Sequence, residues 1–119
     1  MNINDVIRIT ESKLLTPETD GNRRVSCGYS CDLLSWVMAH GKKDMVWITV
    51  QTHMNVVAVA GLMDMSAVII PEGIEMEKAS LDKAVEEGIT ILQSTKSAYE
   101  LCAVLAAEGL GAVDSAEEQ

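Results

Sequence analysis

The sequence is poor in aromatic and basic residues and has no phenylalanine. Aromatic residues make up 3% of the 119 positions, and 9 Lys and Arg stand against 18 Asp and Glu, a formal net charge of −9. Nucleic-acid-binding domains normally carry a basic stripe that neutralises phosphates, and anionic lipid attracts the same kind of surface. The charge therefore argues against a nucleic-acid-binding protein and against one that attaches to a membrane surface.

The sequence also lacks long hydrophobic runs and an even number of cysteines. No apolar run reaches the ~20 residues of a membrane span, and the first residues lack the basic and apolar regions of a signal peptide. Three cysteines, Cys27, Cys31 and Cys102, exclude complete disulfide pairing within one chain. These features favour a cytoplasmic, reducing location. With 48% hydrophobic residues, the chain has enough apolar side chains for a core.

Helical and strand patterns alternate along the chain. Residues 45–51 are β-branched and almost wholly apolar, which is typical of a strand buried on both faces of a parallel sheet. Other strands are predicted at residues 13–16, 25–30, 67–70 and 89–92, and helices at 3–11, 31–39, 55–64, 80–87 and 95–108. The alternation predicts an α/β fold with a mostly parallel sheet of about five strands and helices on its faces. One domain is expected over residues 1–111, followed by a disordered acidic tail over residues 112–119.

Several apolar positions carry predictions about burial. Leu33, Leu34, Val37 and Met38 are expected to form the buried side of their helix, and Val85 is expected to point inward. Cys102 lies on an apolar helix face and is expected in the core, as free cysteines usually are. Residues 56–63 are hydrophobic nearly all round, which places this helix against a second element or against another subunit.

Polar residues follow the predicted strands, and in an open parallel sheet ligands bind at the carboxyl ends of the strands. The strongest group is residues 51–55, where a strand runs into Gln-Thr-His-Met-Asn and a helix begins. Free backbone N–H groups at a helix start favour an anion or a phosphate. The candidate ligand-binding residues are Ser30, Asp32, Gln51, Thr52, His53, Asn55 and Lys96.

The same residues also have purely structural interpretations. Ser30 is a candidate helix N-cap with Asp32 in the first turn, and Thr52 is a candidate N-cap of the next helix. Ser94 or Thr95 is the candidate cap of the last helix. His53 then remains a surface histidine. Both interpretations stay open at this point.

Several chemical motifs are absent. The sequence has no Walker-type phosphate loop, no G-x-G-x-x-G fingerprint and no G-x-S-x-G elbow. His40, His53 and the scattered cysteines match no zinc spacing, so neither a metal nor a cofactor is predicted. A metal or iron–sulfur site built from Cys27, Cys31 and His53 is the weaker alternative.

Two stretches resemble the DRTGG-domain family: residues 28–35, Gly-Tyr-Ser-Cys-Asp-Leu-Leu-Ser, and residues 46–60, Val-Trp-Ile-Thr-Val-Gln-Thr-His-Met-Asn-Val-Val-Ala-Val-Ala. Residues 67–70 and 88–92 fit the same pattern, so the resemblance covers about residues 3–110. The family is similar to the N-terminal domain of HPr kinase/phosphorylase, and elsewhere it accompanies CBS domains or a phosphotransacetylase domain. The resemblance implies an α/β fold, a tendency to dimerise and a regulatory or ligand-sensing role. Small stand-alone members are often encoded near iron hydrogenase or related redox genes.

One turn departs from the family pattern. The Asp-Arg-Thr-Gly-Gly turn that names the family corresponds here to Pro71, Glu72 and Gly73. Because proline lacks an N–H group and Glu72 is acidic, this turn is expected to be a poor anion cradle. The kinase chemistry of HPr kinase resides in a C-terminal P-loop domain, which this sequence lacks.

The leading hypothesis is a non-catalytic regulatory or ligand-sensing module, homodimeric through residues 56–63. Its expected partners are a small phosphorylated ligand or nucleotide and a redox protein. A second hypothesis is a small enzyme acting on a phosphorylated or acyl substrate, with His53 as general acid or base oriented by Asp32. A third is a metal or redox accessory protein that uses Cys27 and Cys31.

Overall fold

Five strands form one sheet in a computed structural model that describes residues 1–113. The order is β1-β5-β4-β3-β2, with β1 antiparallel to β5 and the other neighbours parallel. The strands are β1 (Lys13–Leu14), β2 (Cys27–Ser30), β3 (Met45–Ile48), β4 (Ala67–Ile70) and β5 (Ile91–Gln93). The predicted α/β fold with a mostly parallel, five-stranded sheet is confirmed.

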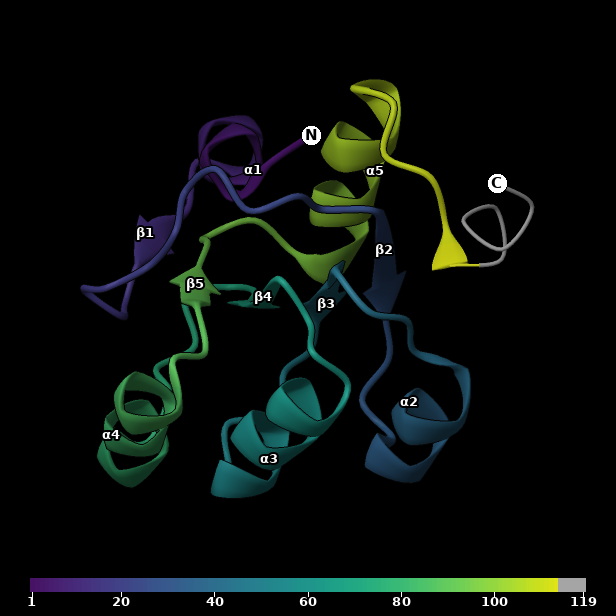
Figure 1. The fold of residues 1–119 in the computed structure, drawn as a ribbon. Helices are drawn as coiled ribbons and strands as arrows, with labels where there is room; N and C mark the ends of the chain where they lie inside the picture. Colours follow the sequence, from purple (N-terminus) through teal and green to yellow (C-terminus); the bar gives the residue numbers. More distant parts are fainter. Residues whose placement is uncertain (114–119) are drawn as a thin grey trace.

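Helices cover both faces of this sheet (Figure 1). On one face lie α2 (Leu34–His40), α3 (Met54–Leu62) and α4 (Lys78–Glu87), and on the other α1 (Ile3–Thr10) and α5 (Ala98–Ala107). Strands β2, β3, β4 and β5 are neighbours in chain order. Crossover connections between parallel strands are almost always right-handed. The three helices that connect β2 to β3, β3 to β4 and β4 to β5 therefore lie on the same face. The result is a three-layer sandwich.

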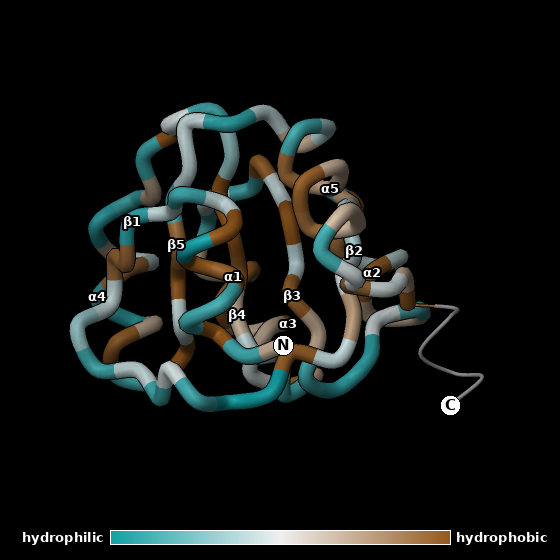
Figure 2. Tube along the Cα trace, turned by 90° about the horizontal axis from the view of Figure 1, so that it is seen from above, coloured by the Kyte–Doolittle hydropathy of each residue, from teal (hydrophilic) through white to brown (hydrophobic). Residues whose placement is uncertain are grey.

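Strands β3 and β4 are wholly buried between the helical layers. In β3, Met45 and Trp47 pack in the apolar cluster under α2, α3 and α4, whereas Val46 and Ile48 pack in the cluster under α1 and α5. Figure 2 shows hydrophobic residues along both strands. Since each strand must be apolar on both faces, residues 45–48 form an unbroken apolar run.

Helix α3 buries one side within the chain itself, while Ala58, Gly61 and Leu62 are exposed. It lies between α2 and α4 (Figure 1), and Val56, Val57, Val59 and Ala60 are all buried. Of the two predicted explanations for this hydrophobic helix, packing against elements of the same chain accounts for these four residues. The predicted subunit contact would have to use the exposed residues of the range 56–63, and it stays a prediction.

Helix α2 begins later than predicted, at Leu34, and its N-cap Leu33 makes no side-chain capping bond. Ser30 is the last residue of β2, so the prediction that it caps this helix is wrong. Only Val37 of α2 is fully buried, while Leu33 and Met38 are exposed, contrary to the prediction. The physical reason is position: α2 connects to the edge strand β2, where one side of the helix has no neighbouring helix.

Helix α5 is capped by Ser97, whose hydroxyl accepts the Glu100 N–H at 3.2 Å. The prediction of Ser94 or Thr95 as the cap is therefore wrong. Ser94 instead donates its hydroxyl to the carbonyl of Thr10 at 2.9 Å, which ties the end of β5 to α1.

Two further burial predictions are wrong. In α5 the buried stripe is Leu101 and Leu105, so Cys102, about 100° further round the helix, is exposed. In α4, Ala84 takes the inward position, and Val85 is exposed.

The C-terminal segment pairs with the free edge of β2. The Gly28 N–H donates to the carbonyl of Gly111 at 2.9 Å, and Gly28 forms a parallel bridge with Ala112. Val113 is 5% exposed and joins the core. The predicted tail therefore does not begin at residue 112, and its remaining residues, 114–119, lie outside the described residues.

Candidate functional site

The loops after β2 and β3 meet at the carboxyl ends of the strands, and Asp32 joins them. Its Oδ1 accepts the Thr49 hydroxyl at 2.9 Å and the Val50 N–H at 3.0 Å. The side-chain amide of Gln51 donates to the Asp32 carbonyl at 3.0 Å. The structure thus brings together two predicted site residues, Asp32 and Gln51, and both hold the loops in place. Asp32 precedes α2 and is not in its first turn, which corrects that prediction.

Thr52 ties the end of β3 to the start of α4. Its hydroxyl lies 3.4 Å from Oε2 of Glu77, the N-cap residue of α4, and its carbonyl accepts the Ser80 hydroxyl at 2.7 Å. Thr52 therefore does not cap α3. Sequence reasoning missed Glu77 and Ser80, because they lie 25 and 28 positions away along the chain.

His53 is the N-cap of α3. Its Nδ1 accepts the Asn55 N–H at 3.2 Å, so the proton of the neutral ring is assigned to Nε2. His53 and Asn55 are both exposed at the start of this helix. Among the described residues no hydrogen bond joins His53 to Asp32, and the bonds that they do form use Asp32 Oδ1 and His53 Nδ1. The pairing required by the enzyme hypothesis is therefore not formed.

Lys96 lies apart from the other candidates. It follows β5, which is three strands away from β2 in the sheet, or about 14 Å at ordinary strand spacing. Its ammonium group is 3.4 Å from Oε1 of Glu11, just after α1. Lys96 and Ser30 therefore do not lie side by side at the carboxyl edge of the sheet.

The crevice of this sheet lies between β4 and β5. The loops after β2, β3 and β4 lead to helices on one face, whereas the loop after β5 leads to α5 on the other (Figure 1). The chain's own backbone closes this crevice: the Glu72 N–H donates to the Lys96 carbonyl and the Gly73 N–H to the Ser94 carbonyl, both at 2.8 Å. These two amides are thus already engaged, in agreement with the prediction that this turn is a poor anion cradle.

The described residues contain no group of three or more His, Cys, Asp or Glu side chains placed to hold a metal ion. Cys27 is fully buried in the apolar core, and Cys31 is half-buried. The hypothesis of a metal or redox site at Cys27 and Cys31 gains no support from this arrangement.

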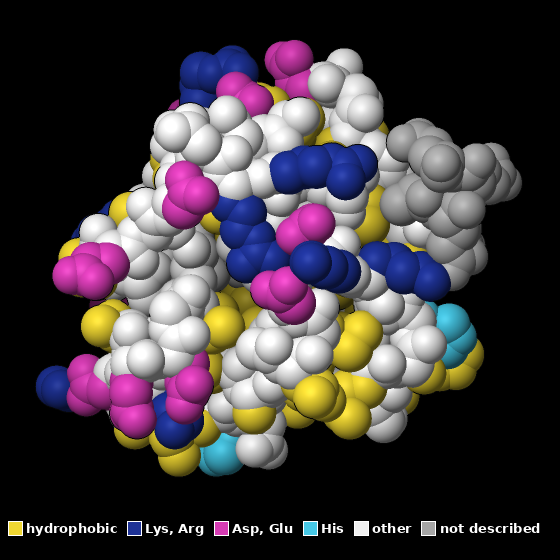
Figure 3. All heavy atoms as spheres, viewed as in Figure 1, with side chains coloured by type: hydrophobic (Ala, Val, Ile, Leu, Met, Phe, Trp, Pro, Cys, Tyr) yellow, Lys and Arg dark blue, Asp and Glu magenta, His cyan; other side chains and the backbone are white. Residues whose placement is uncertain are grey.

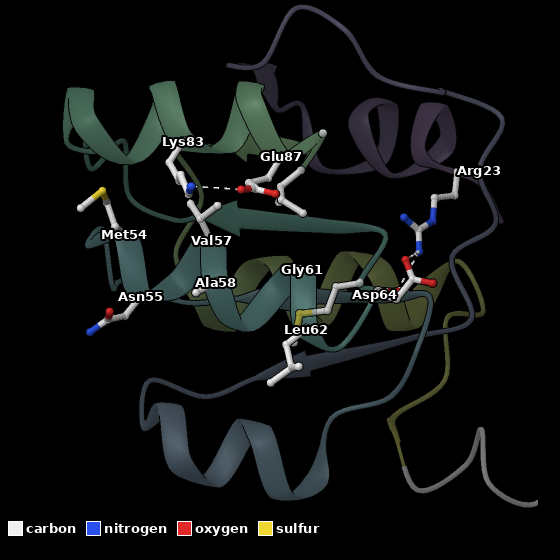
Figure 4. Close-up of a pocket in the computed structure, with 13 residues that line it drawn as sticks. Arg23, Met54, Asn55, Val57, Ala58, Gly61, Leu62, Asp64, Lys83 and Glu87 are labelled. Atoms are coloured by element: carbon white, nitrogen blue, oxygen red, sulfur yellow. Dashed lines mark hydrogen bonds and ion pairs between the residues drawn. The ribbon is translucent and has the colours of Figure 1, made fainter.

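A broad groove of about 570 Å³ lies between α3 and α4 (Figure 4). Two ion pairs line it: Arg23 with Asp64 at 3.0 Å, and Lys83 with Glu87 at 3.0 Å. The guanidinium of Arg23 lowers the pKa of the Asp64 carboxyl. Since both cations are neutralised by carboxylates, the groove offers little net attraction to an anion. Sequence reasoning missed it because its residues come from three separate segments.

None of the described helices is long and apolar enough to cross a membrane. No protein-family model matches the chain, and no curated protein matches it.

Among solved structures, the chain is similar to the CBS and DRTGG domains of the regulatory region of a Clostridium perfringens pyrophosphatase, complexed with the activator diadenosine tetraphosphate. The TM-score is 0.69 at 11% sequence identity, over 97% of this chain and 49% of that chain. The chain thus spans about half the length of that structure. The likeness establishes a DRTGG-like fold, and the similarity to HPr kinase stays a prediction.

Proposed function

We propose that the chain is a regulatory module that acts by binding rather than by catalysis. The observation that carries the proposal is its likeness to a regulatory region along 97% of its length. The site supports it: Asp32, Gln51 and Thr52 are engaged in holding loops together, and within residues 1–113 no hydrogen bond joins His53 to a carboxylate. Such an arrangement suits a rigid binding platform.

The proposed ligand is a small phosphorylated compound, with nucleotides first, because the similar regulatory region is complexed with diadenosine tetraphosphate. The proposed contacts are Thr52, His53 and Asn55 at the start of α3. His53 and Asn55 are exposed, and the positive end of the helix dipole favours a phosphate there. Lys96 is left out of this proposed site because it follows β5, two strands away from β3, and Ser30 is left out because it belongs to β2 and not to the start of α3.

A thermal-shift titration tests the proposal. A ligand that binds only the folded state raises the melting temperature with concentration. The probes are ATP, diadenosine tetraphosphate, acetyl phosphate and coenzyme A. At least one should raise the melting temperature, and His53→Ala should remove most of that rise. The control is Tyr99→Ala, which removes an exposed ring on the opposite helical layer and should leave the rise unchanged. If no probe raises the melting temperature, the proposed ligand class is wrong.

In a regulatory module, ligand binding must also alter the interaction with another protein surface. The homodimer expected from the sequence is the first such assembly to test. Redox proteins are the first heterologous partners to test, because the family resemblance places small members near redox genes.

A further inference from the structure

Helices α2 and α3 together expose a surface without charged side chains. Neither helix contains Asp, Glu, Lys or Arg. Leu62 of α3 is 73% exposed, and Met38 of α2 is 47% exposed. Figure 3 shows hydrophobic side chains gathered over α2 and the neighbouring part of α3. Contiguous apolar patches on a folded surface mark interaction sites.

A groove lies on each side of α3. The groove of about 570 Å³ separates α3 from α4, and a second groove of about 330 Å³ lies between α2 and α3. Asn55, Ala58 and Leu62 line both grooves. Because these residues are three and four positions apart, they form one line along the exposed side of α3. Ala58 in the middle of this line is small, so a second helix can approach α3 closely there.

We infer that an amphipathic helix of a partner protein binds along α3, with its apolar side on α3 and its basic residues toward α4. Amphipathic helices bind hydrophobic grooves in this way, through apolar residues at spacings of three, four and seven. The inference goes beyond the proposed ligand binding, because it names the kind of protein partner. We call the exposed side of α3 and its two grooves the α3 surface, which includes Met38, Asn55, Ala58, Gly61 and Leu62.

The charges along α4, which runs beside α3 (Figure 4), favour a basic partner. At the start of α4, the Glu77 carboxylate accepts a hydrogen bond from the Thr52 hydroxyl at 3.4 Å, and a neutral hydroxyl does not cancel its charge. At the end of α4, Glu86 and Glu87 lie 3.9 Å and 3.0 Å from the single ammonium group of Lys83. Two carboxylates thus share one cation, and negative charge remains at both ends of α4.

The spacing of these charges fits a helix. Glu77 and Glu87 are ten positions apart, which is about 15 Å along α4. Lysines or arginines ten or eleven positions apart on a partner helix have nearly the same spacing and lie on one side, because eleven residues make about three turns. A second copy of this chain is a poorer occupant, since each copy carries a formal net charge of −9 and two copies repel each other.

A peptide titration followed by calorimetry, without nucleotide, tests the inference. The probe is the synthetic peptide LKKLLKLLKKLLKL, an amphipathic helix whose first and last lysines are eleven positions apart. It should bind the wild-type chain saturably and one to one. The same peptide with glutamate in place of every lysine should not bind, because its charge has the sign of α4.

Leu62→Glu separates binding at the α3 surface from attraction by overall charge. It removes the most exposed large apolar side chain of this surface and adds a negative charge. Affinity for the peptide should fall roughly tenfold or more, whereas attraction by overall charge alone would become stronger. The control Ala103→Glu adds the same charge at an exposed position of α5 and should not weaken binding. Glu77→Gln should weaken binding roughly threefold, and the control Glu108→Gln on the opposite helical layer should not.

A wild-type chain that does not bind the lysine peptide would overturn the inference. Unchanged or tighter binding by Leu62→Glu would also overturn it, as would an equal loss of affinity in Ala103→Glu. Sedimentation without peptide tests the other occupant: a wild-type dimer that Leu62→Glu dissociates would assign the α3 surface to a second copy and overturn the inference. Circular dichroism checks that each variant is folded, and Ala58→Glu replaces Leu62→Glu if the latter unfolds. Because no nucleotide is present, failure here leaves the thermal-shift test of the proposed function intact, and the reverse also holds.

Discussion

Asp32, which the sequence predicts to contact a ligand, holds two loops together in the structure. Its carboxylate accepts two hydrogen bonds from the loop after β3, and one donor is the hydroxyl of Thr49, which is buried. The sequence correctly placed Asp32 and Gln51 at one edge of the sheet. It could not indicate their partners, because a carboxylate that binds a ligand and one that binds a neighbouring loop look alike in a sequence.

Asp32→Ala should lower the free energy of unfolding by about 2 kcal/mol, since the buried Thr49 hydroxyl loses its acceptor. Asp32→Asn keeps an oxygen in the accepting position and should cost about half as much. Urea denaturation of both variants measures the difference. If the free energy of unfolding of Asp32→Ala equals that of the wild-type chain, these hydrogen bonds do not contribute to stability.

Arg23 makes stability depend on pH. Its guanidinium donates to Asp64 Oδ1 at 3.0 Å and holds the pKa of that carboxyl below the ordinary value of 3.8. A group whose pKa is lower in the folded state stabilises the fold above its unfolded pKa, and this contribution is lost as the pH falls through the folded value. The wild-type chain should therefore lose part of its stability below about pH 4.

Arg23→Gln isolates this effect. At neutral pH the variant should be less stable than the wild-type chain, because the ion pairs with Asp44 and Asp64 are lost. Between neutral pH and about pH 3 its free energy of unfolding should fall less steeply than that of the wild-type chain. The free energy of unfolding is measured by thermal or urea denaturation across this pH range. The same decrease with pH in the variant and in the wild-type chain would contradict the role given to Arg23.

At the scale of elements, strands were predicted more accurately than helix starts. The β3 and β4 runs are visible in the sequence because both faces are buried and every residue must be apolar. Helix starts were misplaced because several Ser and Thr residues near each strand end can serve as caps. Loop contacts from distant segments decide among them, as Ser94 shows by bonding to Thr10 rather than capping α5.

Two glycines should respond in opposite ways to alanine. Gly61 lies in the exposed part of α3, where an added Cβ would meet only Ile89 Cδ1 at 3.6 Å, so Gly61→Ala should raise stability by about 1 kcal/mol. Gly88 ends α4 with φ of 71°, a conformation that disfavours alanine, so Gly88→Ala should lower stability by about 1 kcal/mol.

Urea denaturation of the two variants side by side checks both signs. Equal changes in one direction would contradict the backbone conformations assigned to these residues. Gly61 also lines the groove between α3 and α4, so a Gly61→Ala variant with an unchanged ligand response would place the ligand outside that groove.

At the scale of the molecule, the fold class followed from the alternation of helices and strands, whereas the strand order did not. That order separates Lys96 from Ser30 and puts the sheet crevice between β4 and β5, where backbone hydrogen bonds close it. No local sequence pattern indicates which strands become neighbours in the sheet. The candidate site assembled from all four strand ends therefore includes residues from strands that are not neighbours, and the part at the start of α3 is the one kept in the proposed binding site.

The most direct test of the regulatory proposal is an NMR titration of the ¹⁵N-labelled chain with ATP and with diadenosine tetraphosphate. The proposal predicts that amide signals of residues 52–56 shift in a saturable way with at least one of them, and that His53→Ala removes the response. Signals that stay unchanged with both ligands, or that move only at residues outside the start of α3, would contradict it.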